Sequence, residues 1–199
     1  MRTGQKLSPT GRINLIDTRQ VEERFQQRGR GAISNQTGRF ELETRQAFDD
    51  GWGTIEDDDS RMETLLMKDS ARTIITFNKS PDISFDRTVN PYRGCEHGCI
   101  YCFARPTHAW GGLSAGLDFE SKLFFKDNAV ELLKRELSRP RYIPRVIAMG
   151  MNTDAYQPVE REKRLTRSLL EVLSAHRHPL SLLTKSALIQ RDIDLIAPM

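Results

Sequence analysis

The stretch NPYRGCEHGCIYCFARPTHAW, residues 90–110, contains all three cysteines of the 199-residue chain. They lie within eight positions as Cys95, Cys99 and Cys102, in the spacing CxxxCxxC. Thiolates this close in sequence can converge on one soft metal centre. Three cysteines are an incomplete set for paired disulfides, and structural zinc usually takes four ligands. The stretch therefore predicts a metal centre whose ligand set is completed by something other than cysteine.

The spacing alone leaves two kinds of centre open. A [4Fe–4S] cluster usually takes four cysteines, so three would leave one iron free to bind a substrate or cofactor. A structural zinc site could instead take His97 or His108 as its fourth ligand, although the chain has no second CxxC-like pair. Gly94 and Gly98 suit a tightly wrapped loop in either case, because glycine accepts a positive φ.

Composition limits the possible partners. The chain has 30 Lys and Arg against 27 Asp and Glu, a formal net charge of +3. This mild excess permits a nucleic-acid partner but does not argue for one, because nucleic-acid binders usually gather basic residues on one face. The N-terminus has no apolar run long enough for a signal peptide, and no stretch resembles a membrane span. We therefore expect a cytoplasmic protein without membrane contact, where clustered thiols more often bind metal.

Residues 1–70 are polar and show no sustained hydrophobic periodicity. This composition is typical of a flexible extension, so we divide the chain into that extension and a core at 71–199. Within the extension, QQRGRGAI places Arg28 and Arg30 beside glycines. An alternative interpretation is that these two arginines contact a polyanion.

The core alternates between strand-like and helix-like segments. The expected elements are a strand at 73–77, a helix at 126–140 capped by Asp127 or Asn128, a buried strand at 145–150, a helix at 159–176, a buried strand at 180–185 and a helix at 187–198. If the segment entering Cys95 is also a strand, this makes about three βα units of an α/β fold with a parallel sheet. The cysteine loop and the loops at 151–160 and 184–186 would then meet at the carboxyl ends of the strands.

The cysteine stretch resembles the cluster loop of radical S-adenosylmethionine (SAM) enzymes, in which an aromatic residue precedes the last cysteine. The stretches SPDISFDRTVNPYRGCEHGCIYCFARPTHAW, GLDFESKLFFK and TDAYQPVE resemble the branch of spore photoproduct lyase and the "DNA repair photolyase"-like proteins. Some bacterial proteins of this branch also carry an RGRGA N-terminal extension. The resemblance implies that residues 71–199 form the N-terminal part of a partial TIM-like barrel.

The resemblance also implies a chemistry for this enzyme family. Cys95, Cys99 and Cys102 would bind three irons of a [4Fe–4S] cluster, and SAM would chelate the fourth through its amino and carboxylate groups. The reduced cluster would break the C5′–S bond and leave a 5′-deoxyadenosyl radical. A reductant such as flavodoxin or ferredoxin would supply the electron. The protein would position the cofactor and exclude water.

Candidate SAM contacts lie in the second loop. Asn152, Thr153 and Asp154 offer acceptors for the methionyl ammonium group, as the family context implies. Thr153 and Asp154 alone would more commonly form a turn. Glu160 could reach the same pocket, or only complement a helix dipole.

Two further residues have open roles. Lys185 in the third loop could pair with the SAM carboxylate, or be an ordinary exposed lysine. Tyr101 and Phe103 are expected to pack beside the cluster and shield it. In the alternative, Tyr101 relays a hydrogen atom, which is the one catalytic role the resemblance offers.

The chain also departs from the family that it resembles. Radical SAM cores usually have six βα units, and the expected pattern here supplies about three, which suggests a truncated product or a complementing chain for the missing half barrel. Spore photoproduct lyase is associated with a further cysteine that is absent here. Repair of thymine lesions is therefore not carried over. Two alternatives stay open: a cluster-binding remnant without catalysis, and a metal-stabilised nucleic-acid-binding module.

Overall fold

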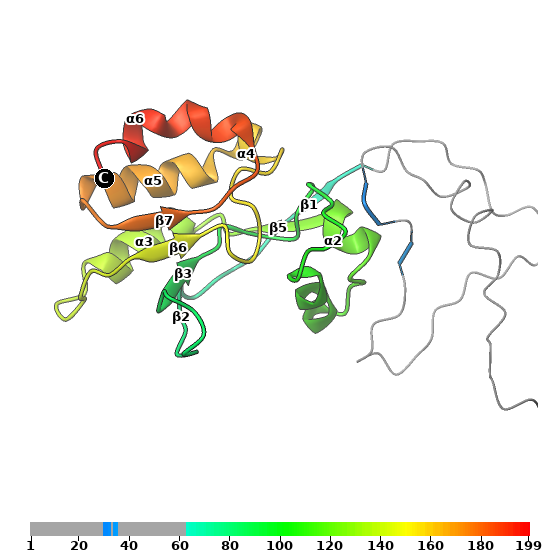
Figure 1. Ribbon diagram of the computed structural model, residues 1–199, viewed down its shortest axis with the longest axis horizontal. Helices are drawn as coiled ribbons and strands as arrows, with labels where there is room; N and C mark the ends of the chain where they lie inside the picture. The colour runs from blue at the N-terminus through cyan, green and yellow to red at the C-terminus, as the bar shows by residue number, and fades with distance from the viewer. Residues whose placement is uncertain (1–29, 33, 36–62) are drawn as a thin grey trace, which may run out of the picture.

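The computed structural model describes residues 30–32, 34–35 and 63–199. The interpretations of Arg28 and of residues 1–29, 33 and 36–62 lie outside the described residues. The described part forms a mixed α/β structure with two β-sheets (Figure 1).

The larger sheet has four strands in the order β2-β3-β6-β7 (Figure 1). The strands are β2 (Ile75–Phe77), β3 (Arg87–Val89), β6 (Ile147–Met149) and β7 (Leu180–Leu182). β3, β6 and β7 run parallel, and β2 pairs with β3 in the antiparallel direction. The strands expected at 73–77, 145–150 and 180–185 are thus confirmed, and the last two run parallel as expected. The segment that enters Cys95 is also a strand, β4 (Tyr92–Arg93), but it belongs to the smaller sheet and pairs there in the antiparallel direction, so that β3 is the third parallel strand.

β7 is not the buried strand that its apolar sequence predicts. It lies at the edge of the sheet, where it pairs with β6, and Ser181 in its centre is exposed. β6 fits the expectation better, because all three of its residues are buried. An apolar run therefore marks a strand in both cases, but its burial depends on the elements that cover it.

The smaller sheet brings the cysteine stretch next to an earlier part of the chain. Its strands are β1 (Leu65–Lys68), β5 (Lys122–Phe125) and β4 (Tyr92–Arg93), in the order β1-β5-β4. β1 runs parallel to β5, and β4 runs antiparallel to it. β1 lies before residue 71, so ordered structure begins earlier than the expected boundary. The reason is tertiary: the short run LLMK forms a strand by pairing with β5.

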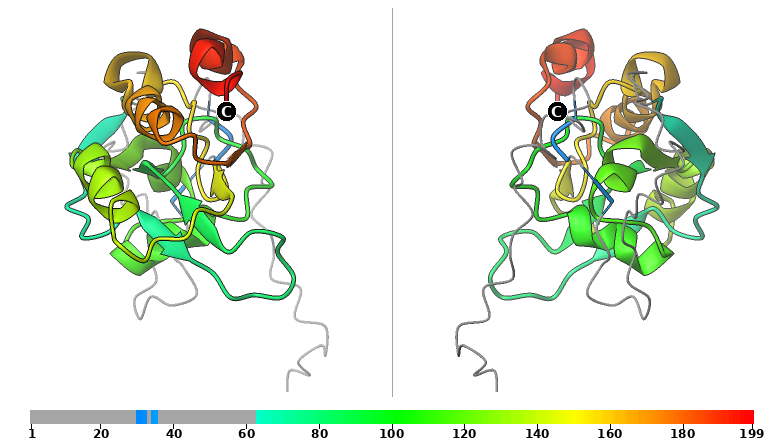
Figure 2. Two further views of the ribbon diagram at one scale, coloured as in Figure 1. Left: turned by 90° about the vertical axis from the view of Figure 1, so that its left-hand side faces the viewer. Right: turned by 90° about the vertical axis from the view of Figure 1, so that its right-hand side faces the viewer.

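The main helices share one hydrophobic core with the larger sheet (Figures 1 and 2). They are α3 (Ala129–Leu137) and α5 (Leu165–Ala175), which pack against each other. Leu133 of α3, Leu169 of α5 and Met149 of β6 are fully buried in this core. The helix expected at 126–140 is therefore confirmed, with narrower bounds. Its expected side-chain cap is wrong, because the Asn128 amide group instead donates to the carbonyl oxygen of Ala71.

The helix expected at 159–176 is interrupted. It consists of α4 (Glu160–Lys163) and α5, separated by Arg164, which has a left-handed φ of 50°. The break lets the buried Glu160 carboxylate accept hydrogen bonds from the N–H groups of Thr166 and Arg167 at the start of α5. These N–H groups have no partner within the helix, so the carboxylate satisfies them.

The last expected helix also has two parts, the 3-10 helix η2 (Ala187–Asp192) and the short α6 (Ile193–Ile196). Two more short helices follow the cysteines along the chain: η1 (Arg105–Gly111) and α2 (Leu117–Ser121). None of the helices in the described part of the chain is long and apolar enough to span a membrane.

Candidate functional site

The three cysteines lie in the loop between β4 and η1. All three are free thiols; Cys95 is buried, and Cys99 and Cys102 are half-buried. The Cys95 N–H group donates to the carbonyl oxygen of Phe119 at 2.9 Å, and the Cys102 N–H group donates to that of Cys99 at 3.1 Å. The backbone of the loop is therefore fixed by α2 on one side and by its own turn on the other.

Apolar side chains lie under the thiols. Cys95 belongs to a small buried cluster with Ala104 and Phe119, and Cys102 packs against that cluster. Burial raises the pKa of the Cys95 thiol to about 11. A metal would have to displace this proton, because the thiolate is the form that binds metal.

The three loops that the sequence placed at the carboxyl ends of the strands do meet. Asp154, after β6, accepts hydrogen bonds from the Thr184 hydroxyl at 2.7 Å and from the Lys185 N–H group at 3.0 Å. The Lys185 ammonium group lies 2.9 Å from the Sγ atom of Cys99. One carboxylate and one lysine thus join the cysteine loop to the loops after β6 and β7.

Asp154 is ionised in this arrangement. Burial alone would favour the neutral acid, but the contact with His97 and hydrogen bonds from Thr184, Lys185 and Tyr156 lower the pKa of Asp154 to about 2. His97 approaches from the cysteine loop, with its Nε2 atom 3.4 Å from the carboxylate. Because the donors come from three separate segments, Asp154 fixes their relative positions.

The neighbours of Asp154 are engaged with the protein itself. Thr153 is buried, and its hydroxyl donates to the carbonyl oxygen of Tyr92 at 3.1 Å. Asn152 is half-buried, and its N–H group donates to the side chain of Asn90 at 3.2 Å. Asp154 also forms the turn expected as the alternative role, because its carboxylate accepts a hydrogen bond from the Tyr156 N–H group two residues later.

Glu160 lies inside the helical layer. It is fully buried and accepts hydrogen bonds from the Tyr92 hydroxyl at 2.5 Å, from the Thr166 N–H group and from Arg191. Several donors from separate elements therefore hold this carboxylate. The described contacts give it a structural role that joins β4, α5 and η2, and none of them is made to a thiol or to Lys185.

The aromatic residues of the cysteine loop, which the sequence places beside a bound cluster, lie at the surface. Tyr101 and Phe103 are both 80% exposed. The apolar surface against Cys95 and Cys102 comes instead from Ala104 and Phe119, which lie inside. The Lys185 ammonium group lies over the Tyr101 ring, 5.8 Å from its centroid.

Sequence reasoning missed the residue that holds the outer side of the cysteine loop. Glu120 of α2 is fully buried, forms an ion pair with Arg105, and accepts hydrogen bonds from the N–H groups of Gly31 and Ala32 at 2.8 and 2.9 Å. Arg30 donates to the Glu120 carbonyl oxygen. These contacts hold residues 30–32 against α2, so the Arg30 guanidinium group is engaged within the protein and supports the polyanion interpretation less.

Two glycines allow this approach. A Cβ atom on Gly31 would lie 1.8 Å from the carbonyl oxygen of Gly98, which no side chain could tolerate. Gly98 itself has a φ of 59°, and a Cβ atom there would lie 2.8 Å from the Glu120 carboxylate. The segment 30–32 and the cysteine loop therefore touch backbone to backbone.

Gln157 was also missed, although it belongs to the quoted motif TDAYQPVE. It is fully buried, accepts a hydrogen bond from the Glu96 N–H group and donates to the Gly94 carbonyl oxygen. In the opposite direction, the Glu96 carboxylate accepts a hydrogen bond from the Val159 N–H group at 2.8 Å. These reciprocal bonds fasten the cysteine loop to the loop after β6.

Among residues 30–32, 34–35 and 63–199, no three His, Cys, Asp or Glu side chains are already placed as a metal site. His97 faces Asp154, and the Nε2 atom of His108 lies 2.9 Å from the Lys122 carbonyl oxygen. Burial lowers the pKa of His108, which stacks edge-on against Phe119. The donor chemistry still fits an iron–sulfur cluster, because three thiols share one loop, and the described contacts of both histidines are to other groups.

Comparison with known proteins found relatives without an assigned activity. The chain is 44% identical over 123 residues to the uncharacterized protein Rv2578c of Mycobacterium tuberculosis, covering 60% of this chain and 36% of that protein. It is 34% identical over 136 residues to the uncharacterized protein MJ0683 of Methanocaldococcus jannaschii, covering 68% of this chain and 48% of that protein. No protein-family model and no solved structure matches the chain. The match thus spans less than half the length of each of these relatives.

Proposed function

We propose that this chain is the N-terminal part of a radical SAM partial barrel that binds a [4Fe–4S] cluster through Cys95, Cys99 and Cys102. One observation carries the proposal: the cysteine loop lies against the loops that follow the parallel strands β6 and β7, through the contacts of His97 with Asp154 and of Cys99 with Lys185. In α/β proteins this edge of the sheet is where ligands bind. The parallel order β3-β6-β7 supports the barrel assignment.

The residues around the thiols suit such a cluster. In the radical SAM family the bound cluster supplies the electron that cleaves SAM into methionine and a 5′-deoxyadenosyl radical. Ala104 and Phe119 keep water from the inner side of Cys95 and Cys102. Gln157 donates to the Gly94 carbonyl oxygen, and Arg105, paired with Glu120, donates to that of Cys99, so the backbone that carries the thiols is held from two sides.

The candidate SAM-binding residues fall into two groups: those that are placed to contact SAM and those that position the loops around it. Lys185 is exposed at its ammonium group and faces Cys99, which suits it to bind the SAM carboxylate. Asn152 keeps its side chain for the methionyl ammonium, whereas Thr153 already donates to Tyr92. Asp154 acts as a positioning residue, because its oxygens hold the loop that carries Lys185. Glu160 is not part of this proposal.

The proposal extends beyond the chain in three respects. The reductant, flavodoxin or ferredoxin by analogy, the substrate, and any DNA-repair-like reaction belong to the whole enzyme. A complementing chain could supply further βα units. Arg30 does not support the nucleic-acid-binding alternative, because its guanidinium group donates to the Glu120 carbonyl oxygen.

Anaerobic reconstitution tests the cluster directly. We expect about four irons and four acid-labile sulfides per chain, as a site with three cysteine ligands and one open iron requires. Cys99→Ala should lose the cluster, and His97→Ala should keep it. One tightly bound zinc without labile sulfide, lost in both variants, would instead establish the zinc alternative.

A second assay separates an enzyme from a cluster-binding remnant. The reconstituted chain is reduced with dithionite and incubated with SAM, and the products are separated by chromatography. Formation of 5′-deoxyadenosine, absent in Cys99→Ala, supports SAM cleavage by this chain. A full cluster that yields no 5′-deoxyadenosine would assign the chain to the remnant alternative.

A further inference from the structure

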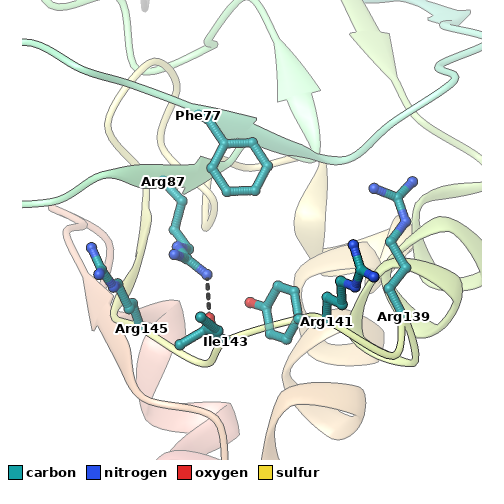
Figure 3. A pocket seen from close by; sticks show the side chains of 7 residues that line it. Phe77, Arg87, Arg139, Arg141, Ile143 and Arg145 are labelled. Atoms are coloured by element: carbon teal, nitrogen blue, oxygen red, sulfur yellow. Dashed lines mark hydrogen bonds between the residues drawn. The ribbon is translucent and has the colours of Figure 1, made fainter.

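A second site lies at the opposite end of the larger sheet. A cavity of about 370 Å³ lies where the end of β2 and the start of β3 meet the segment that connects α3 to β6. Figure 3 shows the side chains that line it. Its lining residues are Phe77, Arg87, Arg139, Arg141, Tyr142, Ile143 and Arg145. In the sheet register Phe77 pairs with Arg87, and Arg87 pairs with Ile147 at the start of β6. The cavity is therefore at the amino ends of the parallel strands, away from the thiols.

The four arginines of this cavity are not equivalent. Arg87 and Arg145 both bind the Asp86 carboxylate, at 2.7 and 3.1 Å, and Arg87 also donates to the carbonyl oxygen of Ile143 (Figure 3). Their charge is thus partly compensated within the protein. Arg139 and Arg141 are exposed, and no bonded partner of their guanidinium groups is found in the described part of the chain. These two arginines are available to an anion.

The apolar side chains of the cavity are exposed. Phe77 is 61% exposed and Ile143 is 67% exposed, although both are large hydrophobic residues. The Arg87 guanidinium lies between two rings, 5.3 Å from the Phe77 centroid and 5.5 Å from the Tyr142 centroid. The Tyr142 hydroxyl is held at 2.7 Å from the buried His178. One wall is therefore rigid, and the exposed Phe77 offers a surface for a planar group.

We propose that this cavity binds a nucleotide, with its phosphate on Arg139 and Arg141 and its base against Phe77. The guanidinium fork matches phosphate oxygens in a bidentate way. Exposed aromatic rings stack bases with little regard to their identity. The volume is in the range of small-molecule sites. A free nucleotide and one nucleotide of a single strand share this chemistry, and the volume of about 370 Å³ favours the free form.

Calorimetric titration of the full chain with guanosine 5′-monophosphate tests the proposal. Inorganic phosphate and guanosine are titrated in parallel, and both should bind more weakly than the nucleotide. The double variant Arg139→Ala/Arg141→Ala should weaken nucleotide binding by about tenfold or more, since two charge-assisted contacts are lost. Arg161→Ala, an exposed arginine on α4, should leave binding unchanged. Absence of nucleotide binding, or equal loss in the control, would overturn the proposal.

A second variant tests the stacking surface. Phe77→Leu keeps an apolar residue on the edge strand, so the fold should survive, as thermal unfolding would verify. It should weaken nucleotide binding about tenfold while leaving inorganic phosphate unaffected. Unchanged nucleotide affinity would remove the base from the proposal and so overturn it.

A competition experiment with an oligonucleotide distinguishes a free nucleotide from one nucleotide within a single strand. A ten-nucleotide single strand of mixed sequence competes with guanosine 5′-monophosphate for the same chain. Binding no tighter than the mononucleotide supports the free ligand. Much tighter binding that Arg139→Ala/Arg141→Ala abolishes assigns the cavity to single strands and overturns the free form.

Discussion

The ammonium group of Lys185 lies 2.9 Å from the Sγ atom of Cys99, a residue 86 positions earlier in the chain. The contact raises the pKa of Lys185, so the lysine is cationic at neutral pH. A cation here can stabilise a thiolate before metal arrives, and can bind an anionic ligand afterwards. The proposed SAM site depends on this relationship.

Replacing Lys185 separates these two roles. Lys185→Met keeps the length of the side chain but removes its charge. We expect a full cluster after reconstitution and SAM binding weakened by about tenfold or more, because one charge-assisted contact is lost. Iron content and equilibrium SAM binding are measured on the same sample. Lys134→Met, on the exposed face of α3, is the control, and equal SAM affinity in both variants would exclude Lys185 from the site.

Glu120 is expected to govern the stability of the cysteine loop. Glu120→Gln keeps the shape but breaks the buried ion pair with Arg105 and sets an NH₂ group against a backbone N–H donor of Gly31 or Ala32. We expect the free energy of unfolding to fall by about 3 kcal/mol, as for other broken buried pairs. Urea denaturation measures it, with the exposed Glu162→Gln as control. A change as small as the control would show that the pair contributes nothing.

The contact between Gly31 and Gly98 can be tested by adding one methyl group. Gly31→Ala would place a Cβ atom 1.8 Å from the Gly98 carbonyl oxygen, so residues 30–32 must move away. We expect the Ala32 amide, now bonded to Glu120, to exchange with solvent about tenfold faster or more. Gly111→Ala is the matched control, because a Cβ atom there meets nothing within 4 Å. Unchanged protection of Ala32 would contradict the packing.

The lowered pKa of Asp154 predicts that the free energy of unfolding decreases as the pH is lowered. Its folded pKa is about 2, below the usual value of 3.8, so the unfolded chain takes up its proton first as the pH falls. Its stabilising effect is complete above about pH 4 and disappears as the pH approaches 2. Unfolding free energies of the parent and Asp154→Asn should therefore differ most at pH 5–7 and converge at low pH. Asp82→Asn, an exposed aspartate, should show no such convergence.

The strands at 145–150 and 180–185 and the helices before them could be predicted because they depend on local sequence patterns. RVIAMG and LSLLTK are short apolar runs, and each follows a segment with helical periodicity. The rule that loops after parallel strands gather at one edge then predicts that Asp154 and Lys185 lie near the cysteines. The spacing of the cysteines themselves also required no tertiary knowledge.

The remaining features depend on contacts between distant residues. Arg164 adopts a left-handed conformation because Glu160 caps the following helix, and a helical pattern gives no sign of such a break. β1 exists because β5 pairs with it. The exposure of Tyr101 and Phe103 follows from the inner positions already taken by Ala104 and Phe119. Nothing in the sequence marks Glu120 as the partner of Gly31, because a buried glutamate and a surface glutamate look the same in sequence.

The position of Glu120 has a practical consequence for shortening the protein. A version that started at β1 would keep every cysteine and both sheets, yet it would strip two N–H donors from a fully buried carboxylate. Water would then have to enter beside Gly98 to hydrate those oxygens. For an oxygen-sensitive centre, that is the side from which damage would begin. Removing a segment that holds no thiol should therefore shorten the lifetime of the proposed cluster in air.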